Sequence, residues 1–424
     1  MLDLLIENLA ELATPLGNVG RRGREQGEIR RVRDAEILCR DGRIAFVGTR
    51  EARRAEIGEL PGVERLDGRG GTAVPGFVDA HTHLPWSGSR EIELAQRLAG
   101  KSYEKISAAG GGILSTVRST RGASRDELVT AMLPRLDRML ACGTTTAEAK
   151  SGYGLTLGDE IKQLEAIAEA SRLQPVELTP TLLAAHEVPA EHRSDRERYL
   201  RIVCDEIVPA VAERGLARFC DVFCERGVFS AEESRRVLLA GRAHGLEPRL
   251  HADEFADSGG AELAAELGAH SADHLMAISE RGIESMAEAA ITALLLPGTS
   301  FYLRKKSWAP ARRLIEAGVP VALATDCNPG SSNTESLPTI VQLAVFELVL
   351  SIEEALTAVT LNAAASLGLG TEIGSLEPGK RADVVILDEP NLFHLAYHYG
   401  VNPVRSVIKS GREVHRAGNL LRRE

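Results

Sequence analysis

Two histidines separated by one residue end an apolar stretch near the start of the chain. The stretch runs Val74-Pro75-Gly76-Phe77-Val78-Asp79-Ala80-His81-Thr82-His83. In an extended strand, residues i and i+2 point to the same side, so His81 and His83 can present two imidazoles to one metal ion. Imidazole is a ligand for both zinc and iron. Two surface histidines beside a turn are the alternative, and the metal interpretation therefore requires further ligands downstream.

Further side chains able to do chemistry stand where later apolar runs end, and they are His186, His251, His274 and Asp326. A lone histidine at such a position is more often a core residue, but several of them together indicate a shared site. His81, His83, His251 and Asp326 make a set of three imidazoles and one carboxylate for a single cation.

Such a cation would lower the pKa of a coordinated water toward neutrality, which predicts hydrolysis as the reaction. An acid beside it must take the proton from water and pass it to the leaving group. Glu254, three residues after His251, is the first candidate, and Asp253 is a weaker one. Asp326 could also do this, and the sequence leaves the choice between Glu254 and Asp326 open. His274 could hydrogen-bond the water or a developing oxyanion.

Side chains so far apart in sequence can meet only if the strands that carry them lie in one sheet. Between residues 71 and 370, apolar runs alternate with amphipathic helical stretches. The strands are expected at 73–83, 144–150, 177–186, 219–225, 248–253, 271–275, 291–297 and 319–326. Eight alternations predict an α/β fold, a (β/α)8 TIM-like barrel, in which the carboxyl ends of all strands meet at one mouth.

Both ends of the chain have β-type patterns. Asp41-Gly42 predicts a hairpin, and residues 51–70 are expected to be a connection. Near the other end, strands are expected at 382–388, 406–409 and 412–415. We expect both ends to form one small composite β domain. The predicted division is 1–70 and 371–424 for the two parts of that domain, and 71–370 for the metal-dependent hydrolase barrel.

Composition and charge exclude several functions. The chain has 424 residues and a formal net charge of −10, which disfavours binding to nucleic acid or to an anionic membrane. No apolar run is long enough to span a membrane. The six cysteines are scattered and form no Cys-x-x-Cys pair, a pattern typical of reduced thiols in a cytoplasmic protein.

The motifs together resemble those of the metal-dependent amidohydrolase superfamily and, more narrowly, of the imidazolonepropionase family within it. The superfamily motifs are Pro75 through His83, Ala324-Thr325-Asp326 and Gly379-Lys380-Arg381-Ala382-Asp383. The narrower resemblance is carried by Ala109-Gly110-Gly111-Gly112-Ile113, Lys150-Ser151-Gly152-Tyr153-Gly154-Leu155, Ala184-Ala185-His186-Glu187, His251-Ala252-Asp253-Glu254-Phe255 and Thr325-Asp326-Cys327-Asn328-Pro329-Gly330-Ser331.

This resemblance implies hydrolytic opening of 4-imidazolone-5-propanoate to N-formimidoyl-L-glutamate, a step of histidine degradation. It implies one divalent or trivalent metal ion, Zn or Fe, bound by His81, His83, His251 and Asp326. The chemistry of the residues adds catalytic roles for Glu254, His274 and Asp326. The implied substrate contacts are Arg90, Tyr153, His186, Glu254, Asn328, Gly330 and Ser331. It also implies a possible homodimer.

Residue chemistry is consistent with these implications. Arg90 could bind the propionate carboxylate of such a substrate in a bidentate way. The expected strand 219–225 offers no lysine that could bridge two metal ions, so one ion is expected. Two alternatives are another enzyme of the superfamily that deaminates a heterocyclic base, and a metal-binding scaffold without catalytic activity.

Overall fold

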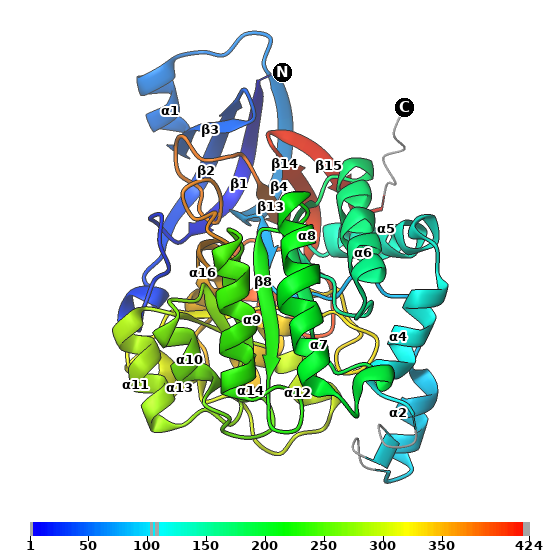
Figure 1. Cartoon of the computed structure of the whole chain (residues 1–424). Coiled ribbons are helices and arrows are strands. Elements are labelled where there is room, and N and C mark those ends of the chain that lie inside the picture. Colours follow the sequence, from blue (N-terminus) through cyan, green and yellow to red (C-terminus); the bar gives the residue numbers. More distant parts are fainter. Residues whose placement is uncertain (1–2, 102–104, 107–109, 419–424) are drawn as a thin grey trace.

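The computed structural model describes residues 3–101, 105–106 and 110–418. Ala109, the first residue of one predicted motif, lies outside these ranges. The described chain forms an eight-stranded barrel surrounded by helices and a separate seven-stranded sheet, which lies at the top of Figure 1. None of the described helices has the length and apolar character needed to cross a membrane.

The eight barrel strands are arranged in chain order, and neighbouring strands are parallel. They are β5 (Phe77–Asp79), β6 (Thr144–Lys150), β7 (Glu177–Ala185), β8 (Phe219–Cys224), β9 (Glu247–Ala252), β10 (Ser271–His274), β11 (Thr292–Leu295) and β12 (Val321–Leu323). The predicted barrel is therefore confirmed. Because all strands run the same way, their carboxyl ends lie at one mouth.

The first and last barrel strands approach each other just beyond their ends. The backbone N–H of Asp326 donates to the carbonyl of His81 at 3.0 Å, and that of His83 donates to the carbonyl of Cys327 at 3.0 Å. These bonds place Asp326 beside the two histidines, although the residues are distant in sequence. The candidate ligands thus lie where the barrel closes.

Helices connect the strands, and many of them cover the outside of the barrel. They are α2 (Glu91–Leu98), α4 (Ile113–Gly122), α5 (Arg125–Ala141), α6 (Leu157–Leu173), α7 (Arg196–Ile202), α8 (Val208–Glu213), α9 (Ala231–Ala243), α10 (Gly260–Glu266), α11 (Glu280–Ala289), α12 (Pro297–Tyr302), α13 (Ala311–Glu316), α14 (Leu337–Glu347), α15 (Ile352–Ala358), α16 (Leu361–Ser366) and α17 (His394–Tyr397). A π-helical turn, η3 (Val203–Ile207), joins α7 to α8, and 3-10 turns occupy η1 (Gly23–Gly27) and η2 (Ala190–His192). Capping boxes begin α5, α9 and α15 at Ser124, Ser230 and Ser351.

The small sheet combines strands from both ends of the chain, as predicted. Its order is β15-β14-β13-β4-β1-β2-β3. The strands are β1 (Leu4–Thr14), β2 (Arg30–Arg40), β3 (Arg43–Thr49), β4 (Glu64–Pro75), β13 (Val384–Leu387), β14 (Val404–Lys409) and β15 (Arg412–Arg416). Asp41 and Gly42 have φ of 47° and 77°, which gives the tight turn between β2 and β3 its primed geometry.

Two expectations about the N-terminal region were wrong. Residues 73–83 are not one strand, because β4 pairs within the small sheet through Pro75 and β5 starts afresh at Phe77. Gly76 separates them; a Cβ there would lie 2.4 Å from Thr145 Oγ1, so only glycine fits. Residues 51–70 are not a plain connection, since they contain most of α1 (Arg50–Ile57) and the start of β4. The domain boundaries at 70 and 370 stay predictions.

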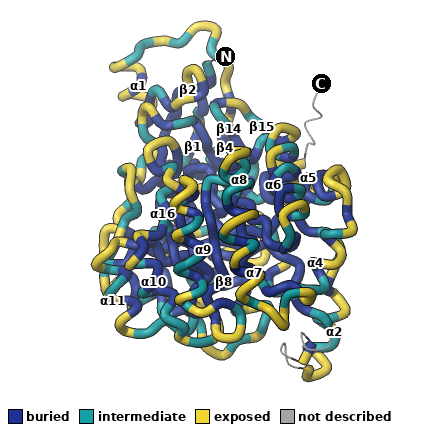
Figure 2. Tube along the Cα trace, viewed as in Figure 1, coloured by how far each residue is buried: buried dark blue, intermediate teal, exposed yellow. Residues whose placement is uncertain are grey.

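Burial follows this architecture, with buried segments in the barrel and the sheet and exposed residues on the outer faces of the helices (Figure 2). The largest apolar core lies between the barrel strands and the helices, and a second core belongs to the small sheet. All six cysteines are free thiols.

Candidate active site

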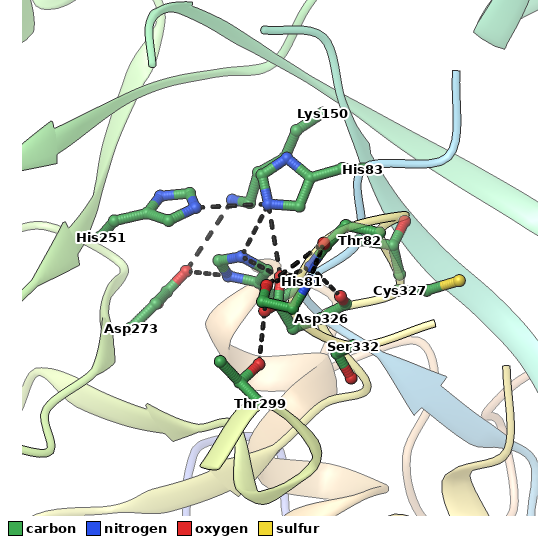
Figure 3. Close-up of polar contacts among 12 residues, drawn as sticks. His81, Thr82, His83, Lys150, His251, Asp273, Thr299, Asp326, Cys327 and Ser332 are labelled. Carbon is green, nitrogen blue, oxygen red and sulfur yellow. Dashed lines mark hydrogen bonds and ion pairs between the residues drawn. The ribbon is translucent and has the colours of Figure 1, made fainter. Parts of the chain in front are cut away.

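The four predicted metal ligands converge at the mouth of the barrel. The Nε2 atom of His83 lies 3.3 Å from Nε2 of His81 and 3.4 Å from Nε2 of His251. Oδ1 of Asp326 lies 3.5 Å from Nε2 of His81 and 3.4 Å from Nε2 of His83. The four side chains point toward one another in Figure 3. Each is almost completely buried.

These distances are in the range expected for donors that share one cation. Zinc–nitrogen and zinc–oxygen bonds of about 2.1 Å place neighbouring donors about 3.0 to 3.4 Å apart. Nδ1 of His81 lies 2.6 Å from a carboxylate oxygen of Asp273 and donates to it, so its Nε2 carries only a lone pair. Lone pairs and a carboxylate oxygen that face one another repel unless a cation lies between them. The donor set therefore fits a bound metal ion.

The protonation states of the imidazoles agree with this. Burial lowers the pKa of His81 and His83 well below the usual value, and the positive charge of Lys150 adds to the effect for both. Both rings are consequently neutral at neutral pH. Neutral imidazole is the form that binds metal ions.

Asp326 is oriented by a residue that the sequence did not indicate. Thr299 in α12 donates its hydroxyl hydrogen to Oδ2 of Asp326 at 2.5 Å, which leaves Oδ1 toward the imidazoles. Asp326 also has a φ of 52°, a conformation that is uncommon for residues other than glycine and that occurs at functional sites. Thr299 lies in an ordinary apolar segment, so no sequence signal could have identified it.

A cavity of about 820 Å³ opens above the ligands. Most of the predicted site residues line it, namely His83, Arg90, Tyr153, His186, His251, Glu254, His274, Asp326, Asn328 and Ser331. Residues from barrel strands one, three, five, six and eight thus share one space. Of the predicted set, His81 lies beneath this space as a candidate ligand, and Gly330 lies behind Arg90.

The structure separates the two acids that follow β9. Asp253 accepts hydrogen bonds from the backbone N–H groups of Ser258, Gly260 and Ala261 at 2.8, 3.2 and 3.0 Å, and so holds the start of α10. Glu254 instead lines the cavity, with Oε2 3.8 Å from Nδ1 of His274. Geometry therefore favours Glu254 over Asp253 as the acid that meets a substrate.

Burial shifts the pKa of both Glu254 and His274. It raises the pKa of Glu254 well above the usual value, and the negative charge of Asp326 contributes further. It lowers the pKa of His274 to about 3. The raised pKa favours the protonated form of Glu254, while the His274 ring stays neutral and can donate one N–H.

The segment that carries Tyr153 is fixed by a buried carboxylate. Glu160 in α6 accepts hydrogen bonds from the backbone N–H groups of Gly152, Gly154 and Leu155 at 3.1, 2.9 and 2.7 Å. Nδ1 of His186 donates to the carbonyl of Gly152 at 2.9 Å, so its Nε2 is left for other partners. The ring of His186 stacks on His83 at 5.1 Å. Tyr153 and His186 thus form a rigid wall beside the ligands.

The turn after Asp326 is organised by Asn328. Its amide oxygen accepts from the N–H groups of Gly330 and Ser331, both at 2.8 Å, and its amide nitrogen donates to the Asp326 carbonyl at 2.6 Å. The amide that we expected to contact a substrate ring is thus largely engaged within its own turn. The N–H of Gly330 is engaged as well.

Arg90 supplies a cation in the cavity, and it is only 7% exposed. Nε and Nη2 lie 2.9 and 2.8 Å from Oε2 of Glu93, which holds the guanidinium in place. A Cβ on Gly330 would lie 1.9 Å from Nη1 of Arg90, so the side chain rests against that glycine. Other arginines and lysines also line the cavity, namely Arg97, Lys101, Arg193, Arg226, Arg304 and Lys305. On a chain of net charge −10, this local positive lining favours an anionic ligand.

Comparisons with known proteins agree with the fold. Residues 96–415 match the model of the amidohydrolase family. Among solved structures, an adenosine deaminase from Xanthomonas campestris with bound Zn superposes with a TM-score of 0.71 at 20% identity, over 97% of this chain and 92% of that one. Guanine deaminase from E. coli gives 0.71 at 18% identity, over 98% of this chain and 100% of that one. At these identities, the likeness concerns the fold alone.

Curated relatives are much more similar. Imidazolonepropionase of Symbiobacterium thermophilum is 49% identical over 422 residues, which are 99% of both chains. Imidazolonepropionase of Geobacillus sp. strain WCH70 is 47% identical over 423 residues, 99% of this chain and 100% of that one. Imidazolonepropionase of Geobacillus kaustophilus is 50% identical over 390 residues, 92% of both chains. The chain therefore belongs to the amidohydrolase family and, within it, to the imidazolonepropionases.

Proposed function

We propose that the chain hydrolyses 4-imidazolone-5-propanoate to N-formimidoyl-L-glutamate, a step of histidine degradation. The observation that carries this proposal is identity of 47–49% to imidazolonepropionases over practically the whole of both chains. The cavity supports it, because a neutral ring with an anionic side chain suits a space that contains both aromatic rings and a buried arginine.

Ring opening requires that a water oxygen add to the ring carbonyl carbon, that the adjacent C–N bond break and that the departing nitrogen receive a proton. His81, His83, His251 and Asp326 would hold one cation, Zn or Fe. Such an ion, when bound, lowers the pKa of water and polarises a carbonyl.

The remaining steps belong to side chains of the cavity. Asp326 is placed to accept the proton of the attacking water, and Glu254, whose pKa burial raises, to donate one to the departing ring nitrogen. His274 would donate its N–H to the oxyanion of the tetrahedral intermediate. Arg90 would bind the propionate, while Tyr153 and His186 enclose the ring.

Purified protein tests the function directly. We expect loss of the ring's ultraviolet absorbance when 4-imidazolone-5-propanoate is added, and loss of this activity after treatment with a chelator. Adenine and guanine serve as comparison substrates, with ammonia release as the readout. Deamination of either base without ring opening of the imidazolone would replace this assignment with a deaminase, and no turnover of any of them would favour a non-catalytic scaffold.

Arg90→Ala should raise KM for 4-imidazolone-5-propanoate about 10- to 100-fold, because a buried hydrogen-bonded ion pair with the carboxylate is lost. Steady-state kinetics measures this. Arg97→Ala is a matched control, since Arg97 lines the same cavity but packs over the Tyr302 ring at 4.8 Å, and its KM should change much less. An unchanged KM in Arg90→Ala would remove the substrate assignment.

Gly330→Ala tests whether substrate binding needs the Arg90 guanidinium in its present position or needs only its charge. The added methyl group would overlap Arg90 Nη1, so the guanidinium must move while its charge remains. KM should rise as in Arg90→Ala, with a smaller change in kcat.

Several finer points belong to this proposal. They are the choice of Zn or Fe, a homodimer as the assembly, a cytoplasmic location and no interaction with nucleic acid or membrane. The division into 1–70, 71–370 and 371–424 likewise remains our proposal for the domains.

A further inference from the structure

In two of the three converging imidazoles, Nδ1, the ring nitrogen that points away from the other ligands, lies close to a buried carboxylate. Nδ1 of His81 lies 2.6 Å from Oδ2 of Asp273, which belongs to β10. Nδ1 of His251 lies 3.0 Å from Oδ2 of Asp221, which belongs to β8. Both carboxylates are buried inside the barrel, at 0% and 1% exposure. Neither aspartate was among the predicted site residues.

A buried lysine joins these two carboxylates. Nζ of Lys150, at the end of β6, lies 2.7 Å from Oδ2 of Asp221 and 3.8 Å from Oδ2 of Asp273. Figure 3 shows Lys150 behind the histidines, with its contact to Asp273. Asp273 also accepts a hydrogen bond from the Ser271 hydroxyl at 2.5 Å, and Asp221 accepts one from the N–H of His251 at 3.2 Å. Both carboxylates are therefore fixed from several sides.

A second layer of charge completes this network. Glu148 lies 2.8 Å from Lys150 and 3.1 Å from Arg249, and all three are fully buried. Burial of five charged groups costs desolvation energy, and an apolar barrel interior would avoid that cost. A function for the carboxylates that face histidines would explain why the interior is charged.

We propose that Asp221 and Asp273 are positioning residues, which fix the orientation and tautomer of His251 and His81 so that Nε2 of each ring faces the cation. A carboxylate that accepts the Nδ1 hydrogen leaves the Nε2 lone pair free for a metal and makes the ring a stronger ligand. Lys150 lies near both carboxylates, 2.7 Å from Asp221 and 3.8 Å from Asp273. Among the described residues, Nδ1 of His83 and Nδ1 of His251 both lack a hydrogen bond, but they differ in that the carboxylate of Asp221 lies 3.0 Å from Nδ1 of His251. This inference rests on the proposed metal site.

The test is the affinity of the protein for Zn²⁺ alone, measured by competition with a chromophoric chelator. Asp273→Asn and Asp221→Asn should each raise the Kd for Zn²⁺ about 10- to 100-fold. The visible spectrum of the Co²⁺-loaded protein should shift in both variants, since the coordination geometry relaxes. An unchanged Kd and spectrum in both variants would overturn the inference.

Glu148→Gln is the matched control. Glu148 belongs to the same buried network and contacts both cations, but no imidazole. The melting temperature of the metal-free protein should fall in all three variants, whereas the Kd of Glu148→Gln should change less than about fivefold. A loss of affinity in Glu148→Gln equal to that in the aspartate variants would assign the effect to general disruption and overturn the inference.

Ser271→Ala covers the case in which the aspartate variants do not fold. It removes one hydrogen bond to Asp273 and leaves the carboxylate, so the Kd should rise about threefold. An unchanged Kd in this variant, with both aspartate variants unfolded, would contradict the inference. Wild-type protein that binds no metal would instead refute the metal site itself, whereas wild-type protein that binds metal and opens the ring leaves the proposed function intact whatever the variants do.

Discussion

Asp326→Asn should reduce kcat for ring opening about 10³-fold or more, because the carboxylate serves as a donor to the cation and as the acceptor of the water proton. Asparagine keeps the shape and can still accept from the Thr299 hydroxyl, so the fold should persist. The variant should also bind Zn²⁺ more weakly than the wild type. The loss of the ring's ultraviolet absorbance with time measures the rate, and elemental analysis measures the metal content.

Asp253→Asn is the control for this substitution. Asp253 is another buried aspartate at the same mouth, but its oxygens hold the backbone at the start of α10. This variant should lose stability and keep its metal, with kcat reduced less than about tenfold. A wild-type kcat in Asp326→Asn would contradict both proposed roles of Asp326, as donor to the cation and as acceptor of the water proton.

Glu254→Gln should lower kcat about 10²- to 10⁴-fold while leaving the metal content unchanged. Glutamine cannot deliver a proton to the departing ring nitrogen, although it occupies the same space. Glu187→Gln is the matched control, because Glu187 lines the same cavity and burial also raises its pKa, yet it accepts from the N–H of Val188 at 2.9 Å. Its kcat should stay close to that of the wild type. Loss of metal in Glu254→Gln, or equal losses of kcat in both variants, would contradict the role of Glu254.

Glu254→Gln should also be more stable than the wild type at high pH. Burial raises the pKa of Glu254 well above that of the unfolded chain, so the folded protein holds its proton more tightly. This contribution to stability is fully present below the unfolded pKa and is lost as pH rises through the folded pKa. Glutamine has no proton to lose. Melting temperatures of metal-free protein between pH 5 and about 9 should therefore fall less for Glu254→Gln than for the wild type. A parallel fall in both would show that Glu254 ionises as readily as a surface glutamate.

The barrel and its convergent histidines could be predicted because parallel strands give a strict rule about where their ends lie. His186, His251 and His274 each end or follow a short apolar run, and the structure brings all three to one cavity. His81 and His83 lie beside His251, although the strand before them is only three residues long. Their shared direction comes from backbone hydrogen bonds to the segment after β12 rather than from a long strand.

Other features depend on contacts that no local pattern contains. Asp221 is a single acid within the apolar run Phe-Cys-Asp-Val-Phe-Cys, and an isolated acid in such a run is a sequence signal for a buried functional carboxylate. Thr299 in α12 contacts Asp326, which follows β12, through a tertiary hydrogen bond that sequence spacing does not reveal. The break at Gly76 is set by Thr145, a residue on the neighbouring strand.

The central claim is that His81, His83, His251 and Asp326 hold one cation, and titration of metal-free protein with Zn²⁺ tests it most directly. Isothermal calorimetry should give one ion per chain, and ring-opening activity should return in proportion and stop rising at one equivalent. His251→Ala should show no tight binding in the same titration. A wild-type chain that binds no ion, or that reaches full activity before any is added, would contradict the claim.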